Sequence, residues 1–432
     1  MICLLLAGSL LLDLSRPPAA STPWKPEDFI SFESASAFDV SPDAAKMVWV
    51  WRKGDETKNG ARTKLMLTNL QTGSEVTLTH GDDNVSQPHF SPDGKTIAFV
   101  SNRIDPQAKL PEDSGQQIWS FDTAGGEPYR LTDARRGIQE YAWQSNGGII
   151  FSSSEDTSSY ENRVKDRKDT SIVVEDEEHE PPIRLFRFDP NTKLTRRVTT
   201  NDTWIESFKV SHDGKSAVTI EGRSLRVNWD NDRAPLVFLN DLTTGTRRQI
   251  LSDPSIHIED IEWSHDDKDL YATSLRSLAH PPYPEAGDTQ LFKLSVQVGS
   301  KEALVELHWD RGLGGSVFPT EDGFLTTLAD GAKWRVTRFT ANSDDYKPET
   351  LEISTSGLSK PEELAQDGRT LIYTASSAST LPQVYVGHLV GHSVETSRQL
   401  THLNAGLNSR RFAKSELVHW KGARGDDIEG IL

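Results

Sequence analysis

Short runs in which apolar and polar residues alternate, each introduced by a tight turn, recur along the whole chain. The stretch SPDGKTIAFVS, residues 91–101, shows the pattern clearly. Pro92 presets the backbone for the first central turn position, and Gly94 suits the positive φ that other residues resist. The residues that follow alternate, so that Ile97 and Phe99 share one face of an extended segment. The pattern predicts a turn followed by a β-strand.

This phrase occurs seven times, and each copy is followed by a second apolar hairpin such as QQIWSFDTAGGEPYRLT from Gln116. The turn residues that mark the copies are Asp43, Asp93, Asn146, Asp213, Asp266, Asp322 and Asp367. The first and last lie 324 residues apart, which gives a mean spacing of 54 residues. A repeat of this length is typical of stacked supersecondary units, most often propeller blades.

Two hairpins in each repeat make a four-stranded blade. The sequence therefore predicts an all-β fold, a seven-bladed β-propeller. A ring of six or eight blades is the alternative, because the sixth unit, from Phe318 to Glu352, departs from the pattern.

Composition narrows the classes of partner. The chain has 432 residues and a formal net charge of −17, which argues against binding to a nucleic-acid backbone. Its single cysteine, Cys3, excludes an intrachain disulfide and a zinc site built from cysteines. No HExxH or other metal-ligand spacing occurs, so neither a metal nor a cofactor is predicted.

The first residues read as an export signal. The apolar run Ile2–Leu12 is too short to span a bilayer, and small residues follow it up to Ser21. Residues 1–21 are therefore predicted to be a signal peptide cut near Ala20, although no basic residue precedes the apolar run. We expect an exported protein, periplasmic or extracellular, with no membrane span in the mature chain; the alternative is a cytoplasmic protein.

The last seventeen residues, ELVHWKGARGDDIEGIL from Glu416, predict a hairpin. Glu416 to Trp420 alternate toward a strand, Gly422 to Asp427 form a turn, and Ile428 begins a second apolar run. A two-stranded ribbon alone is marginal in water. We therefore expect residues 22–410 to form the propeller and residues 411–432 to begin a truncated second domain.

The repeats resemble two families. Phrases of the form SPDGK–strand, followed by QIW and a later LT, occur in TolB-type propellers and in the propellers of serine peptidases of the prolyl oligopeptidase family. The C-terminal segment distinguishes the two, since these peptidases leave the propeller through a similar motif that opens their α/β-hydrolase domain. The matching positions are Glu416, Trp420, Lys421, Gly425, Ile428, Gly430 and Leu432.

The resemblance favours the acylaminoacyl-peptidase and dipeptidyl-aminopeptidase branch, because the third unit carries a charged insertion as that branch does. It implies the N-terminal propeller of a serine peptidase, which gates the access of peptides to a catalytic domain absent from this chain. The alternative is a stand-alone TolB-like periplasmic propeller that binds a protein partner. The oligomeric state is left open.

No catalytic residue is expected within this chain. A hydrolase nucleophile needs a Gly-x-Ser-x-Gly elbow, and the nearest approach, GKSAV from Gly214, lies in a blade turn. The chain is therefore expected to be an inactive fragment when alone. The hydrolase domain would supply the triad and the oxyanion hole.

The longest interval between turn residues contains an acidic insertion, which includes Glu175, Asp176, Glu177, Glu178 and Glu180. One interpretation is a solvated loop or short helix on the propeller rim. The other is a binding site for the amino terminus of a peptide, since two convergent carboxylates suit an ammonium group. Dipeptidyl-peptidase relatives use paired glutamates in this way, so Glu177 and Glu178 are the candidate substrate-binding residues.

Overall fold

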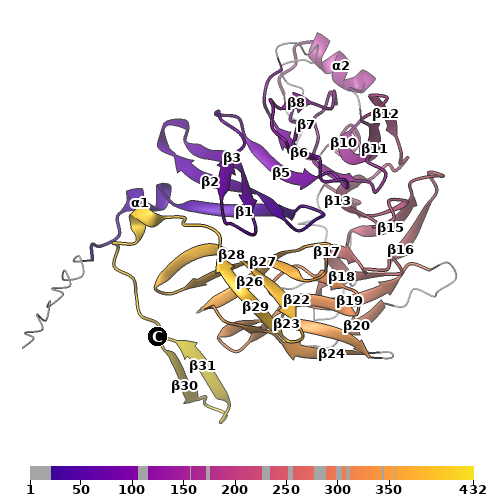
Figure 1. Cartoon of the computed structure of the whole chain (residues 1–432). Coiled ribbons are helices and arrows are strands. Elements are labelled where there is room, and N and C mark those ends of the chain that lie inside the picture. The colour runs from indigo at the N-terminus through magenta and orange to yellow at the C-terminus, as the bar shows by residue number, and fades with distance from the viewer. Residues whose placement is uncertain are drawn as a thin grey trace, which may run out of the picture.

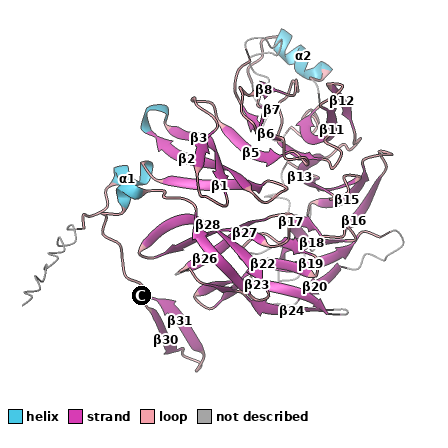
Figure 2. Cartoon of the chain, viewed as in Figure 1, coloured by secondary structure: helices cyan, strands magenta, loops and turns pink. Residues whose placement is uncertain are grey.

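The computed structural model describes residues 21–105, 115–155, 157–171, 176–225, 234–251, 256–276, 289–297, 304–307, 312–342, 345–355 and 357–432. The predicted signal peptide, except for Ser21, lies outside these residues. Strands dominate the described chain, and their sheets are arranged around a centre (Figures 1 and 2). The predicted all-β propeller arrangement is confirmed.

Five sheets are separate blades. The first has β1 Glu33–Val40, β2 Lys46–Asp55, β3 Gly60–Asn69 and β4 Glu75–Thr77. The second has β5 Val85–Phe90, β6 Thr96–Ser101, β7 Gln117–Asp122 and β8 Tyr129–Arg130. The others are β17 Ile256–Trp263, β18 Asp269–Arg276, β19 Thr289–Ser295 and β20 Leu304–Leu307; β21 Phe318–Thr320, β22 Gly323–Asp330, β23 Lys333–Asn342 and β24 Asp345–Thr350; and β25 Glu352–Ile353, β26 Leu358–Leu364, β27 Thr370–Ser377, β28 Thr380–Val390 and β29 Ser393–Gln399.

The third and fourth sequence repeats share one eight-stranded sheet. It contains β9 Glu140–Trp143, β10 Ile149–Ser154, β11 Ile183–Asp189, β12 Leu194–Arg197, β13 Trp204–Val210, β14 Ser216–Gly222, β15 Leu236–Asp241 and β16 Arg247–Leu251. The two repeats are joined where β11 and β13 run parallel and Ile183 pairs with Trp204. The prediction of seven separate blades is therefore wrong. The described chain forms five separate blades and this joined sheet, because one parallel pairing connects two neighbouring repeats.

The described residues form few helices, which lie outside the sheets. They are α1 Pro26–Ile30, α2 Ser159–Asp166 and the 3₁₀ turns Glu56–Lys58 and Ala405–Leu407. The remaining sheet is a C-terminal hairpin of β30 Leu417–Lys421 and β31 Asp427–Ile431, which projects from the ring in Figure 1.

The turn phrase folds as its chemistry predicts. The Ser91 hydroxyl donates to Asp93 at 2.7 Å, and the same carboxylate oxygen accepts the Lys95 N–H at 3.1 Å. Gly94 takes a φ of +68°. The hydrogen bond from Ser91 lowers the pKa of the Asp93 carboxyl. The turn therefore fixes the start of the strand that follows it.

The core is divided among the contacts between repeats. In the part of the chain that the structure describes, clusters of buried apolar side chains join consecutive repeats around the ring. One cluster joins the last repeat back to the first and includes Phe38, Met47 and Trp49 with Ile372 and Val384. Stacking of repeats therefore buries apolar surface at each contact between neighbours.

Polar contacts reinforce the seam between the first and last blades. The Asn404 carboxamide accepts the Glu33 N–H at 2.7 Å and donates to the Glu33 carbonyl at 2.8 Å. The Asn404 N–H in turn donates to the Glu33 carboxylate at 3.0 Å. Asn404 is 4% exposed and has a φ of +61°, a conformation that Asn tolerates better than most residues.

Replacement of Asn404 by Ala should destabilise the ring. The substitution removes two hydrogen bonds from a buried site and places Ala at a positive φ, so we expect a loss of about 2–3 kcal/mol in the free energy of unfolding. Urea denaturation measures this loss. Asn408→Ala, at an exposed position in the same loop, is the control and should change stability by less than about 0.5 kcal/mol. Equal stabilities for the two variants would contradict a closing role for Asn404.

Candidate functional site

A cavity of about 1270 Å³ lies at the centre of the ring. Its walls come from the inner strands and turns of six repeats, the second to the seventh. They include Phe90 at the end of β5, Trp143 at the end of β9, Lys209 on β13, Glu262 on β17 and Glu363 on β26. The first strands of successive repeats contact each other, which explains why residues far apart in the sequence meet here. This cavity is the candidate functional site.

Acidic side chains predominate among the charged groups that line this cavity. Asp260, Glu262, Glu362 and Glu363 all line it. Lys209 lies among them, with its Nζ 3.0 Å from Glu262 Oε2. Arg338 and Arg369 also line the cavity, and Arg338 is paired with Asp322 at 2.9 Å. Clefts lined by one sign of charge focus the electrostatic field and concentrate ligands of opposite charge. The arrangement therefore favours cationic groups over anionic ones.

Burial and mutual repulsion change the protonation of these groups. Burial raises the pKa of Glu363 well above its usual range, and the nearby carboxylates of Asp39 and Glu262 add to the effect. Burial also raises the pKa of Glu140. The Glu262 carboxylate raises the pKa of Lys209, which therefore keeps its charge.

Two of the inner carboxylates also join neighbouring repeats. Asp39 on β1 accepts the N–H of Phe90 at 2.7 Å, and Glu140 on β9 accepts the N–H of Phe208 at 3.2 Å. A carboxylate that accepts a backbone N–H recovers part of the solvation lost on burial. Asp39 and Glu140 therefore help to hold the first strands of neighbouring repeats together.

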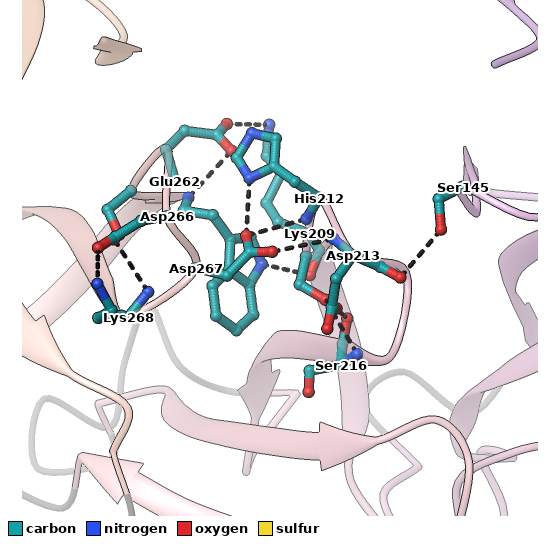
Figure 3. A network of polar contacts seen from close by, with 12 residues as sticks. Ser145, Lys209, His212, Asp213, Ser216, Glu262, Asp266, Asp267 and Lys268 are labelled. Atoms are coloured by element: carbon teal, nitrogen blue, oxygen red, sulfur yellow. Dashed lines mark hydrogen bonds and ion pairs between the residues drawn. The ribbon is translucent and has the colours of Figure 1, made fainter. Parts of the chain in front are cut away.

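A second polar network surrounds the turns after β13 and β17 (Figure 3). Asp267 accepts hydrogen bonds from the N–H groups of His212 and Asp213, both at 2.9 Å. His212 Nδ1 lies 2.7 Å from the same carboxylate. Ser145 extends the network toward the preceding repeat by donating to the Asp213 carbonyl at 2.9 Å. The turns of three repeats are thus held together beside the cavity.

Glu177 and Glu178 lie away from this cavity and are not among its lining residues. Glu177 accepts hydrogen bonds from the Ser224 hydroxyl at 2.6 Å and the Leu225 N–H at 2.9 Å. Glu178 is exposed. Glu177 is thus held by the Ser224–Leu225 segment. Glu175, from the same acidic run, lies outside the described residues.

The rest of the insertion is attached to the third repeat. Helix α2 begins at a capping box of Ser158 and Glu161, and Glu161 also pairs with Arg136. His179 stacks on Tyr160 with ring centroids 3.6 Å apart, and its Nδ1 lies 2.9 Å from Asp176. The described part of the insertion is therefore a folded element on the rim.

The C-terminal hairpin presents an apolar face. Val418, Trp420 and Ile428 lie on one side of the ribbon, where the Trp420 ring covers Gly430. Trp420 is 47% exposed, and Leu432 is 80% exposed. On the propeller side, the Glu429 carboxylate accepts the N–H of Ala332 at 3.3 Å. The ribbon thus contacts the β22–β23 turn and leaves apolar surface uncovered.

Two other features, metal-ion sites and membrane-spanning helices, were sought among the described residues. They contain no group of three or more His, Cys, Asp or Glu side chains placed to hold a metal ion. Nor does any described helix have the length and apolar character needed to cross a bilayer.

Sequence reasoning missed the charged cavity because its residues come from several different repeats. A weak signal was present in the segment IEDIEW from Ile258, where Asp260 and Glu262 alternate with Ile261 and Trp263 before the turn. In a propeller these positions belong to inner strands. The pattern of one repeat, however, does not show which side chains of other repeats it meets.

Comparison with known proteins supports the resemblance to peptidases. No family model matches the chain. A stretch of 151 residues is 27% identical to the uncharacterized peptidase YuxL of Bacillus subtilis, covering 34% of this chain and 22% of that protein. A stretch of 102 residues is 29% identical to dipeptidyl-peptidase 5 of Porphyromonas gingivalis, covering 23% and 15% of the two chains. The matched stretches thus span less than a quarter of either relative's length.

Solved structures share the fold. An acylaminoacyl peptidase of Pyrococcus horikoshii aligns with a TM-score of 0.64 at 15% identity, over 95% of this chain and 59% of that one. The β-propeller domain of the Trilobed protease of Pyrococcus furiosus, described as having an open velcro topology, aligns with a TM-score of 0.55 at 14% identity. That alignment covers 87% of this chain and 98% of the other. The fold is that of peptidase propellers of the prolyl oligopeptidase family. The predicted resemblance is confirmed.

Glu363→Gln should stabilise the protein at neutral pH. A carboxyl whose pKa is raised by folding binds its proton more tightly in the native state. Its contribution to the free energy of unfolding therefore falls as the pH rises above the pKa that the carboxyl has in the unfolded chain. The amide removes this penalty, and we expect a gain of about 1 kcal/mol at pH 7–8 that disappears below about pH 4. Thermal unfolding across this pH range measures the difference.

Glu362→Gln is the matched control, because the Glu362 carboxylate already accepts a hydrogen bond from Thr374 at 2.8 Å. It should give no gain at neutral pH. A Glu363→Gln variant that is no more stable than the parent at pH 8 would contradict the burial of an uncompensated charge.

Proposed function

We propose that this chain is the propeller portion of a serine peptidase of the prolyl oligopeptidase family, of the dipeptidyl- or acylaminoacyl-peptidase type. In this proposal, residues 22–410 form the propeller and residues 411–432 begin an α/β-hydrolase domain that continues beyond Leu432. The central cavity gates the access of peptides to that domain. The protein is exported after removal of residues 1–21.

The exposed apolar face of the C-terminal hairpin is the observation that carries the proposal. A ribbon of two strands needs another layer against one face to be stable, and Trp420 and Ile428 supply an apolar surface for such a layer. The motif in which they stand resembles the entry to the hydrolase domain in peptidases of this family. The relatives named as peptidases agree with this interpretation.

The position of the hairpin linker relative to the N-terminal segment supports the same proposal. The N–H of Thr22 donates to the Ser409 carbonyl at 2.9 Å, and Trp24 Nε1 donates to the Arg411 carbonyl at 3.0 Å. Asp28 pairs with Arg410 at 2.6 Å. The segment entering the ring and the segment leaving it therefore lie side by side. A domain attached after residue 432 would be anchored close to both.

The acidic cavity suggests the charge of the peptides admitted. With Lys209 already paired to Glu262, the remaining carboxylates leave an excess of negative charge. A peptide with a free amino terminus or basic side chains would be attracted, and an acidic peptide would be repelled. This preference should weaken with added salt, because salt screens such interactions.

The first test compares the chain with a longer product of the same reading frame. The chain alone should not hydrolyse fluorogenic aminoacyl or acylaminoacyl amides. A product with roughly 250 further residues, the size of one domain, should contain a serine elbow, hydrolyse such amides and react with a fluorophosphonate probe. Unrelated sequence after residue 432 would overturn the proposal and favour a stand-alone TolB-like propeller that binds a protein partner.

The paired glutamates are tested in the longer enzyme. If they bind the amino terminus of the peptide, Glu178→Ala should raise KM for substrates with a free amine by about tenfold, the loss of one charge-assisted hydrogen bond. N-acylated substrates should be unaffected and serve as the control. Glu177→Ala is less selective, because Glu177 also holds Ser224 and Leu225. An unchanged KM in the double variant would exclude this role.

A further inference from the structure

Two histidines occupy equivalent turn positions in consecutive repeats. The turns read SHDGK from Ser211 and SHDDK from Ser264, so His212 and His265 each precede the turn aspartate. Both side chains line the central cavity, and their ring centroids lie 6.1 Å apart. His212 has 54% of its side chain exposed, and His265 is also exposed. Neither ring is enclosed in the core.

Asp267 fixes the orientation of one of these rings. Its carboxylate lies 2.7 Å from His212 Nδ1 and also accepts the N–H groups of His212 and Asp213 (Figure 3). With three donors on one carboxylate, Nδ1 carries the hydrogen and Nε2 keeps its lone pair. A carboxylate bonded to the far nitrogen is the usual support of a histidine that binds a metal ion, because it fixes the tautomer and raises the basicity of the ring.

We propose that His212 and His265 bind a borderline divalent transition-metal ion, Zn²⁺ or Co²⁺, at the mouth of the cavity, with Asp267 as the positioning residue. Imidazole is a preferred ligand of these ions. Two imidazoles on one tetrahedral zinc ion place their ring centroids about 5 Å apart. The observed separation of 6.1 Å is close to this value, and rotation of two exposed side chains can supply the difference.

The charges on the two turns favour a dication. Three carboxylates lie there, those of Asp213, Asp266 and Asp267, against two lysines. Lys215 pairs with Asp213 at 3.1 Å and Lys268 pairs with Asp266 at 2.6 Å, so the carboxylates outnumber the lysines. No third protein ligand of the required type is in place among the described residues. The remaining coordination positions are therefore open to water or to a donor group of a ligand in the cavity.

Isothermal titration of the chain with Zn²⁺, after treatment with EDTA, tests this assignment. We expect one saturable equivalent whose affinity falls about tenfold or more in His265→Ala, the cleaner variant, because His265 has no polar contact to lose among the described residues. His212→Ala should have a similar effect. His80→Ala, an exposed histidine on the first repeat, is the control and should leave the affinity unchanged.

Two further measurements distinguish metal binding by His212 and His265 from a purely structural role of these residues. Co²⁺ should give a visible absorption band with the parent chain and lose it with the double histidine variant, while thermal unfolding confirms that the variant is folded. Asp267→Asn keeps an acceptor and tolerates positive φ, so it should bind Zn²⁺ about tenfold more weakly without unfolding. Unchanged Zn²⁺ affinity in the folded double variant, or no saturable binding by the parent chain, would overturn the proposal.

Discussion

The closure of the ring between its first and last repeats is the constraint on which the rest of this structure depends. A sheet with one apolar face must be covered by another, and in a ring every face is covered only if the ends meet. The extra strand of the last blade, β25, comes from the segment just before that blade and pairs with β29, so it does not connect the first blade to the last. The ring is instead closed by the apolar cluster around Trp49 and Ile372 and by the hydrogen bonds between Glu33 and Asn404.

Closure also concentrates like charges at the centre. Polar residues alternate with bulky ones along the inner strands, and the ring brings these polar positions together from several repeats. Two unit charges 4 Å apart interact by about 1 kcal/mol in water but by about 4 kcal/mol at the effective dielectric of a protein surface. Lys209 offsets part of this repulsion, and backbone N–H groups of neighbouring repeats solvate Asp39 and Glu140. Burial raises the pKa of Glu363, and the part of the repulsion that is not offset adds to this effect.

The sequence predicted features that depend on neighbouring residues and failed where distant residues meet. The Ser91–Asp93–Gly94 turn and its strand could be predicted, since both are determined within a few positions of the chain. The joined sheet of the third and fourth repeats could not, because it depends on one pairing between Ile183 and Trp204 that only the folded ring creates. For the same reason the sequence did not show that the Glu177 carboxylate accepts a hydrogen bond from Ser224, which lies 47 residues further along the chain.

The polar contacts at the two ends of the ring connect its closure to the position of the hairpin. Arg410 follows the loop of Asn404 by six residues and pairs with Asp28, just before the first strand. Displacement of residues 409–411 would therefore strain their contacts with Thr22, Trp24 and Asp28. These contacts lie next to the bonds between Glu33 and Asn404, so displacement of the linker and loosening of the seam are coupled events. Because the inner strands on either side of this seam carry Asp39 and Glu363, the electrostatics of the cavity would change with them.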